Sequence, residues 1–130
     1  AILADHADIA PVDRLEPVAE RADILALMEA VKAVRFRDEL RHYAVALVGA
    51  TRGHPQVQLA ASPRAALALM KVSQAMAFFA GGEFVTPEVI QLVAADVIAH
   101  RMVLAPEARY SGTSARQIVA ELLETIPVPI

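Results

Sequence analysis

Apolar residues recur at helical spacing along most of the chain and predict five helices. The first covers residues 21–33, where apolar positions lie three or four residues apart. The second begins at Asp38 and ends before Gly53 and Pro55, residue types that stop helices. The positions at helical spacing are Ile24, Leu27, Met28 and Val31 on the first helix and Leu40, Tyr43, Ala44, Leu47, Val48 and Thr51 on the second. Between the helices, residues 34–36 alternate and predict a short extended segment.

The third predicted helix is the most apolar of the five. Ser62 is suited to the N-cap and Pro63 to the first helical position, and two glycines after residue 80 end the helix. Its polar residues form one narrow strip, which consists of Arg64, Lys71 and Gln74. A helix this apolar is typically surrounded by others, so we expect it at the centre of the bundle, with Leu67 and Met70 buried.

Two further helices are predicted over residues 87–100 and 114–125. Thr86 and Pro87 repeat the start signal of the third helix, and Ser114 and Gln117 have the spacing of a capping box. Residues 1–20 contain two prolines and no sustained periodicity, so we expect an extended connector there. The pattern therefore predicts an all-α bundle of about four to five helices over residues 21–130, with residues 1–20 leading into it.

Composition narrows the class of protein. Of the 130 residues, 56% are hydrophobic and 21% are charged, which favours one packed domain over disorder. The formal net charge of −3 predicts no general attraction to nucleic acid or anionic lipid. The longest uncharged run, residues 72–82, is short of the roughly 20 residues needed to span a bilayer. Without cysteine there are no disulfides or zinc–thiolate sites, and we expect a soluble, cytoplasmic piece of a longer protein.

Motifs of catalysis and metal binding are missing from the sequence. It contains no GxxxxGK[ST] phosphate loop, no GxGxxG, no GxSxG and no HExxH. The four histidines are scattered and none has a histidine partner four residues on, so we predict no metal site. We therefore expect no enzymatic activity from this chain by itself.

Arg64 stands out because a cation in the first helical turn lies against the positive end of the helix dipole. One interpretation is a solvated arginine whose stem covers apolar surface. The other is an anion site, because a helix start attracts phosphate and a guanidinium adds a forked donor there. The chain has no phosphate loop of its own, so such a phosphate would be held by another domain.

Five segments together resemble the C-terminal helical lid of MoxR-type AAA+ ATPases, which are relatives of the magnesium-chelatase ATPase subunit. The segments are YAVALVGATRGHP (43–55), LAASPRAAL (59–67), EFVTPEVIQLVA (83–94), IAHRM (98–102) and IPVP (126–129). Each is modest alone, but their order and spacing extend the resemblance over almost the whole chain, from residue 15 to residue 129. The sequence departs from the usual family pattern at Ala60, often glycine, and at Gly82, often arginine.

The resemblance implies a role for several residues. Arg64, in the SPR motif, resembles the sensor-2 arginine that reaches the γ-phosphate of ATP. Ser62 belongs to the cap of the same helix, and the resemblance implies that it contributes to cofactor binding together with Tyr43 and Leu47. Tyr43 and Leu47 correspond to positions that often face the adenine side. The parent would be an ATP hydrolase using ATP and Mg²⁺, with the lid closing over nucleotide bound by its own AAA+ core, and residues 1–20 would connect that core to the lid.

The resemblance also implies partners. They are neighbouring subunits of a ring and von Willebrand factor A-type proteins, and the parent would act as a chaperone-like ATPase that remodels or matures other complexes. A rival hypothesis is a free-standing helical protein-interaction module with no nucleotide role. A DNA-binding helix-turn-helix is disfavoured because the third helix carries only two cations, Arg64 and Lys71.

Overall fold

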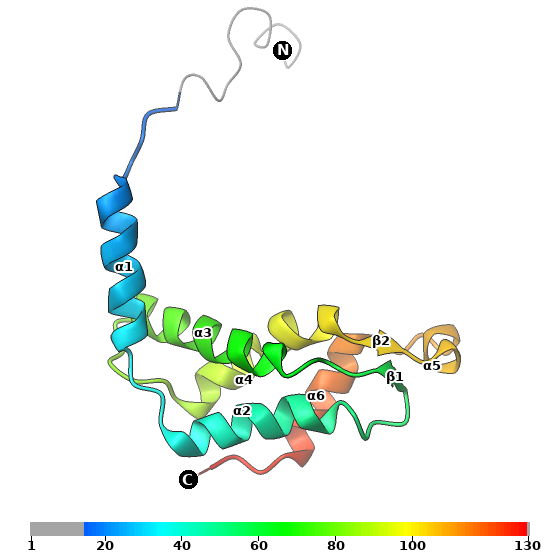
Figure 1. Ribbon diagram of the computed structural model, residues 1–130. Helices are drawn as coiled ribbons and strands as arrows, with labels where there is room; N and C mark the ends of the chain where they lie inside the picture. Colours follow the sequence, from blue (N-terminus) through cyan, green and yellow to red (C-terminus); the bar gives the residue numbers. More distant parts are fainter. Residues whose placement is uncertain (1–14, 130) are drawn as a thin grey trace, which may run out of the picture.

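The computed structural model describes residues 15–129, which form a helical bundle with a very small sheet (Figure 1). The expected all-α fold is confirmed, with additions in segments too short to show periodicity. In the described part of the chain the elements are α1 (Arg21–Ala33), α2 (Asp38–Ala50), β1 (Val57–Leu59), α3 (Arg64–Phe79), α4 (Pro87–Ile98), the 3₁₀ helix η2 (Ala99–Arg101), β2 (Val103–Leu104), α5 (Pro106–Tyr110) and α6 (Ala115–Thr125).

Local capping signals place the helix ends close to their predicted positions. At the start of α6, the Ser114 hydroxyl accepts a hydrogen bond from the Gln117 N–H at 3.2 Å, and the Gln117 side chain accepts one from the Ser114 N–H at 2.7 Å. The predicted capping box is therefore confirmed. A second capping box, between Glu20 and Asp23, starts α1 and was not anticipated.

The centre of the bundle is α4, and the prediction that the third helix lies there is wrong. Helix α4 packs against α2, α3, α6 and η2, and five of its residues are buried. Helix α3 packs against α1, α2 and α4 but leaves large apolar side chains exposed, among them Leu67, Val72, Met76 and Phe79. The high apolar content of α3 predicts that this helix packs against other elements, but it does not predict how many faces of the helix those elements cover.

One narrow stripe attaches α3 to the bundle. Its buried residues recur every four positions and are mostly small: Ala65, Leu69, Ser73 and Ala77. Small side chains at this spacing allow the backbones of two helices to approach closely. The four-residue spacing therefore explains why α3 packs tightly on α4 although most of its apolar surface lies elsewhere.

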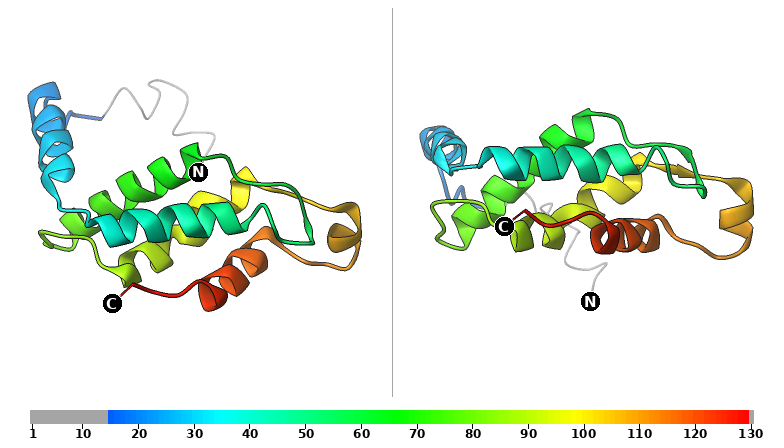
Figure 2. Two further views of the ribbon diagram at one scale, coloured as in Figure 1. Left: turned by 60° about the horizontal axis from the view of Figure 1, so that its bottom comes forward. Right: turned by 90° about the horizontal axis from the view of Figure 1, so that it is seen from below.

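Helix α1 projects from one end of the bundle and α5 forms the opposite end (Figure 2). None of the residues of α1 is buried, and its apolar side chains are about half exposed. In the connector predicted for residues 1–20, only residues 15–20 are described; they are exposed and non-helical. Residues 1–14 lie outside the described part of the chain.

Two short pairings join segments that are distant in sequence. Strands β1 and β2 pair antiparallel, with Val57 opposite Leu104. The extended segment predicted at residues 34–36 is confirmed, because Arg35 forms a parallel bridge with Phe84. The two hydrogen bonds of this bridge run from the Arg35 N–H to the Glu83 carbonyl at 3.0 Å and from the Val85 N–H to the Arg35 carbonyl at 2.9 Å.

Candidate functional site

A buried threonine fixes the loop that leads into α3. Thr51, at the end of α2, is completely buried. Its hydroxyl donates a hydrogen bond to the Val48 carbonyl at 2.6 Å and accepts one from the Ala61 N–H at 3.2 Å. Because Ala61 is also fully buried, the loop is held against α2 immediately before the SPR motif.

The start of α3 is closed by backbone hydrogen bonds. Pro63 has helical dihedral angles, and the N–H groups of Ala65 and Ala66 donate to the carbonyls of Ser62 and Pro63 at 2.8 and 3.1 Å. The prediction that the Ser62 side chain caps this helix is wrong, because it makes no capping hydrogen bond. With these two N–H groups already engaged, attraction of an anion here depends mainly on the Arg64 side chain.

Arg64 combines a rigid backbone with an exposed side chain. The next residue, Ala65, is fully buried, which anchors the first turn of α3 on the bundle. The Arg64 side chain is exposed and, within residues 15–129, forms no ion pair and no hydrogen bond. The guanidinium can therefore bind a group supplied by another molecule without first breaking an interaction with the described part of this chain.

An apolar groove of about 480 Å³ runs beside Arg64 between α2 and α3. Its walls include Val45 from α2 and Leu67 from α3, which are 60% and 58% exposed, and Arg41 lies across the groove from Arg64. The prediction that Leu67 is buried is wrong, and Met70, at the edge of the groove, is only partly buried. Val45 was not predicted as part of a site. The one signal in the sequence is that Val45 is apolar although it lies outside the apolar stripe of its helix.

Tyr43 and Leu47 lie in the core. Tyr43 is 4% exposed and Leu47 is 1% exposed. The Tyr43 hydroxyl accepts a hydrogen bond from the Gln91 side chain of α4 at 3.3 Å. Their burial in the core gives no support to the expectation that they face adenine, and the candidate site does not include them.

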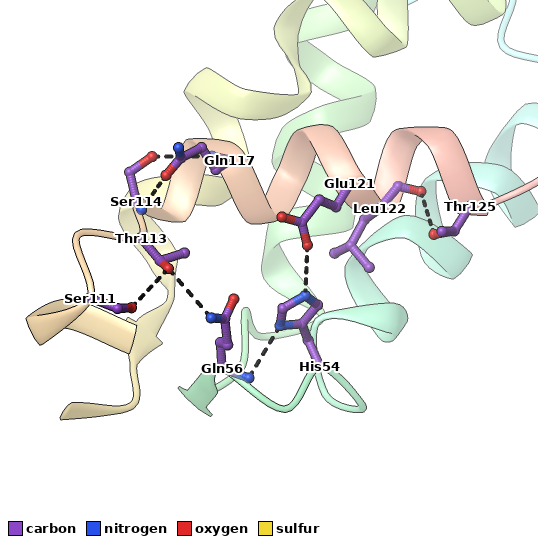
Figure 3. A network of polar contacts seen from close by, with 9 residues as sticks. All are labelled: His54, Gln56, Ser111, Thr113, Ser114, Gln117, Glu121, Leu122 and Thr125. Carbon is purple, nitrogen blue, oxygen red and sulfur yellow. Dashed lines mark hydrogen bonds and ion pairs between the residues drawn. The ribbon is translucent and has the colours of Figure 1, made fainter. Parts of the chain in front are cut away.

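A polar network on the other side of the bundle joins the turn after α2 to α6 (Figure 3). The Nδ1 atom of His54 accepts a hydrogen bond from the Gln56 N–H at 3.3 Å, and its Nε2 atom contacts Glu121 at 3.2 Å. With Nδ1 as acceptor, Nε2 carries the proton and donates to the carboxylate. His54 thus has a structural role here. The Gln56 side chain adds a hydrogen bond to Thr113 at 3.4 Å.

The described residues offer neither a metal site nor a membrane span. Across residues 15–129, no group of three or more histidine or carboxylate side chains could hold a metal ion. Nor is any helix in this range long and apolar enough to cross a bilayer. Arg64 and the adjoining groove therefore remain the best candidate site in this part of the chain.

Comparisons with known proteins converge on one family. The family model described as "AAA lid domain" matches residues 49–122. The chain is 42% identical over 120 residues to "Uncharacterized protein YeaC" of Bacillus subtilis, covering 92% of this chain and 38% of that protein. It is 29% identical over 121 residues to "Chaperone MoxR1" of Mycobacterium tuberculosis, covering 86% of this chain and 32% of that protein.

Structural comparison agrees. A solved structure from Cytophaga hutchinsonii, described as a "putative ATPase", matches with a TM-score of 0.84 and 29% identity, covering 98% of this chain and 41% of that one. The chain thus spans less than half the length of each of these proteins. The family model begins inside α2 and ends inside α6, so it includes the start of α3 and Arg64. These similarities confirm the resemblance to the lid of MoxR-type AAA+ ATPases, and the chain belongs to the AAA lid domain family.

Proposed function

We propose that this chain is the lid of an AAA+ ATPase and that Arg64 is its sensor-2 residue. In this proposal the lid closes over ATP and Mg²⁺ bound by an α/β core, and the Arg64 guanidinium contacts the γ-phosphate. The observation that carries the proposal is an exposed arginine with no ionic partner among residues 15–129, held on a rigid helix start beside an apolar groove. Family membership and the similarity to "Chaperone MoxR1" support the same role.

The energetics favour an external anion at this position. A cation in the first helical turn costs about 0.3–1 kcal/mol against the helix dipole. Asp and Glu are absent from the first turn of α3, so the helix does not offset this cost itself. A phosphate held by the core would convert the unfavourable charge into a forked, charge-assisted hydrogen bond.

The test is ATP turnover by the longer parent protein. We expect Arg64→Ala to lower turnover by about 10²–10³, which is the usual effect of removing one donor that stabilises transition-state charge. Arg64→Lys should restore little, because an ammonium lacks the planar fork of the guanidinium. ADP affinity should remain near the wild-type value, because ADP has no γ-phosphate.

A matched control is Arg109→Ala, which removes an exposed arginine from α5, outside the groove. It should leave turnover unchanged. Wild-type turnover in the Arg64→Ala protein would contradict the sensor assignment. Equal loss of ADP and ATP binding would instead point to a misplaced lid. The 130-residue chain alone should bind ATP weakly or not at all, because it has no phosphate loop.

The biological setting of the parent is also a proposal. We propose that the parent assembles into a cytoplasmic ring in which the lid contacts its own core and a neighbouring subunit. Similarity to "Chaperone MoxR1" supports a chaperone-like role. We propose further that the parent remodels or matures other complexes, with von Willebrand factor A-type proteins as partners, as the sequence resemblance implies. Co-purification of the intact parent with such a protein, lost when the lid is deleted, would test this setting.

A further inference from the structure

A second, larger cleft of about 940 Å³ lies where the end of α1, the start of α2 and the middle of α3 meet. We call it the basic cleft. Its lining contains five cationic side chains and two carboxylates, a net charge of +3 in a chain whose formal net charge is −3. The charged residues are Lys32, Arg35, Arg37, Arg41, Lys71, Asp38 and Glu39.

The fold creates this concentration of positive charge. Along the extended segment, Val34 and Phe36 are buried at 5% and 6% exposure, so the alternate residues Arg35 and Arg37 face solvent. Their side chains are about 6.6 Å apart along the strand, and Arg41 follows one helical turn after Arg37. The result is three arginines close together along the chain on one side of the cleft, with Lys71 contributed by α3.

The floor of the basic cleft is rigid. The Gln74 side chain of α3 donates a hydrogen bond to the Val34 carbonyl at 2.8 Å. The backbone of Arg35 is held on both sides by its bridge to residues 83–85. The cations are therefore mounted on backbone that binding need not reorganise, which lowers the entropic cost of association.

Two of the five cations have no ion-pair partner in the described part of the chain, Arg35 and Lys71. The other three pair with exposed carboxylates of the same chain: Lys32 with Glu29, Arg37 with Glu39 and Arg41 with Asp38. Exposed pairs of this kind contribute only about 0–1 kcal/mol. The three cations can therefore leave these carboxylates and pair with carboxylates of a ligand at little cost in free energy.

The arrangement suits carboxylates spread along a peptide better than one compact phosphate. A helix start attracts phosphate, but the first turn of α2 already contains Asp38 and Glu39. The hydrogen bond from its own N–H, and then Arg37, lower the pKa of Glu39, so this carboxylate stays charged and occupies the helix end. An extended peptide, by contrast, repeats its side chains about every 6.6 Å on one face, which matches the spacing of Arg35 and Arg37 along their own extended backbone.

We infer that the basic cleft binds an extended acidic segment of a partner protein. Carboxylates at alternate positions of that segment contact Arg35, Arg37 and Arg41, with Lys71 on the facing wall. The intervening side chains point away from the cleft, and the apolar lining, which includes Phe36 and Met70, packs against the backbone and the methylene groups of the segment. Arg64 itself does not line the basic cleft, but the cleft adjoins the groove beside Arg64, because Phe36, Arg41 and Met70 line both.

The inference is tested by titrating the folded 130-residue chain into a fluorescent peptide of alternating Glu and Ala and measuring anisotropy. The double variant Arg35→Gln/Lys71→Gln should weaken binding about tenfold or more. The control Arg52→Gln/Arg109→Gln removes the same charge from exposed arginines outside the cleft and should weaken it far less. Asp38→Asn should tighten binding, because it removes a competing carboxylate from Arg41.

Three results would overturn the inference. Equal weakening by the two double variants would show a response to net charge alone. Displacement of the peptide by inorganic triphosphate at much lower concentration than by unlabelled peptide would assign the cleft to phosphate. Binding that is present in the 130-residue chain but lost in the longer parent would show that the cleft is an internal interface. Circular dichroism spectra of all variants would establish that each remains folded.

Discussion

At the residue scale, the position of Arg64 depends on the buried hydroxyl of Thr51, which holds the loop that leads into α3. Replacing Thr51 with Val keeps the shape of the side chain but leaves the buried Ala61 N–H without its acceptor. We expect a loss of about 1–3 kcal/mol in the free energy of unfolding, the usual cost of an unsatisfied buried donor. Denaturant titration measures it. Thr51→Ser, which retains the hydroxyl, should recover much of the loss, and equal losses in the two variants would make the methyl group responsible.

Burial separates two leucines that the sequence does not distinguish. Leu69 is fully buried, whereas Leu67 is 58% exposed. We therefore expect Leu69→Ala to cost about 2–5 kcal/mol of stability. Leu67→Ala should cost about 0.5 kcal/mol or less, as substitutions on the surface usually do. Thermal unfolding of the two variants compares them directly, and similar losses would mean that the chain covers Leu67 in solution.

At the scale of elements, a glycine that ends a helix differs from a glycine inside one. Gly81 has φ of +76° and follows α3; the N–H groups of Gly81 and Gly82 bond the carbonyls of Phe78 and Ala77 at 2.9 and 2.8 Å. This Schellman arrangement needs a left-handed residue. Gly81→Ala should therefore lower the free energy of unfolding by about 1–2 kcal/mol.

Gly49→Ala is the matched control for Gly81→Ala. Gly49 lies inside α2, and an added Cβ there meets no heavy atom within 4 Å. We expect this change to raise stability by about 0.5–1 kcal/mol, because alanine is the better helix former. Chemical denaturation of both variants should show shifts of opposite sign. Shifts of the same sign would contradict the backbone argument.

Helix boundaries were largely predictable because their causes are local. Pro87 at the first position of α4, the Ser114–Gln117 capping box and the glycines after α3 act within one turn, so the sequence contains all the information needed. Helix α5 and the two strands escaped prediction because segments of two to five residues are too short to show a period. In addition, the pairing of β1 with β2 joins segments that are more than 40 residues apart in the chain.

At the scale of the whole molecule, protection from solvent is unevenly distributed. Helix α1 contains no buried residue, whereas α4 contains five and packs against four other elements. Local opening is easiest where few apolar contacts are lost. Amide hydrogens of α1 should therefore exchange with deuterium much faster than those of α4, with α6 between them. Mass spectrometry with peptide resolution measures this order, and equal protection of α1 and α4 would contradict it.

The sequence by itself determined the helical class, most helix ends and the place of Arg64 in the first turn of α3. These follow from caps, prolines, glycines and periodicity, which act between near neighbours in the chain. Tertiary structure alone decided which apolar faces are covered, and so made α4 the centre and left Leu67 beside an open groove. The reason is physical: periodicity shows that a helix has an apolar face, whereas burial depends on what the rest of the chain places against it.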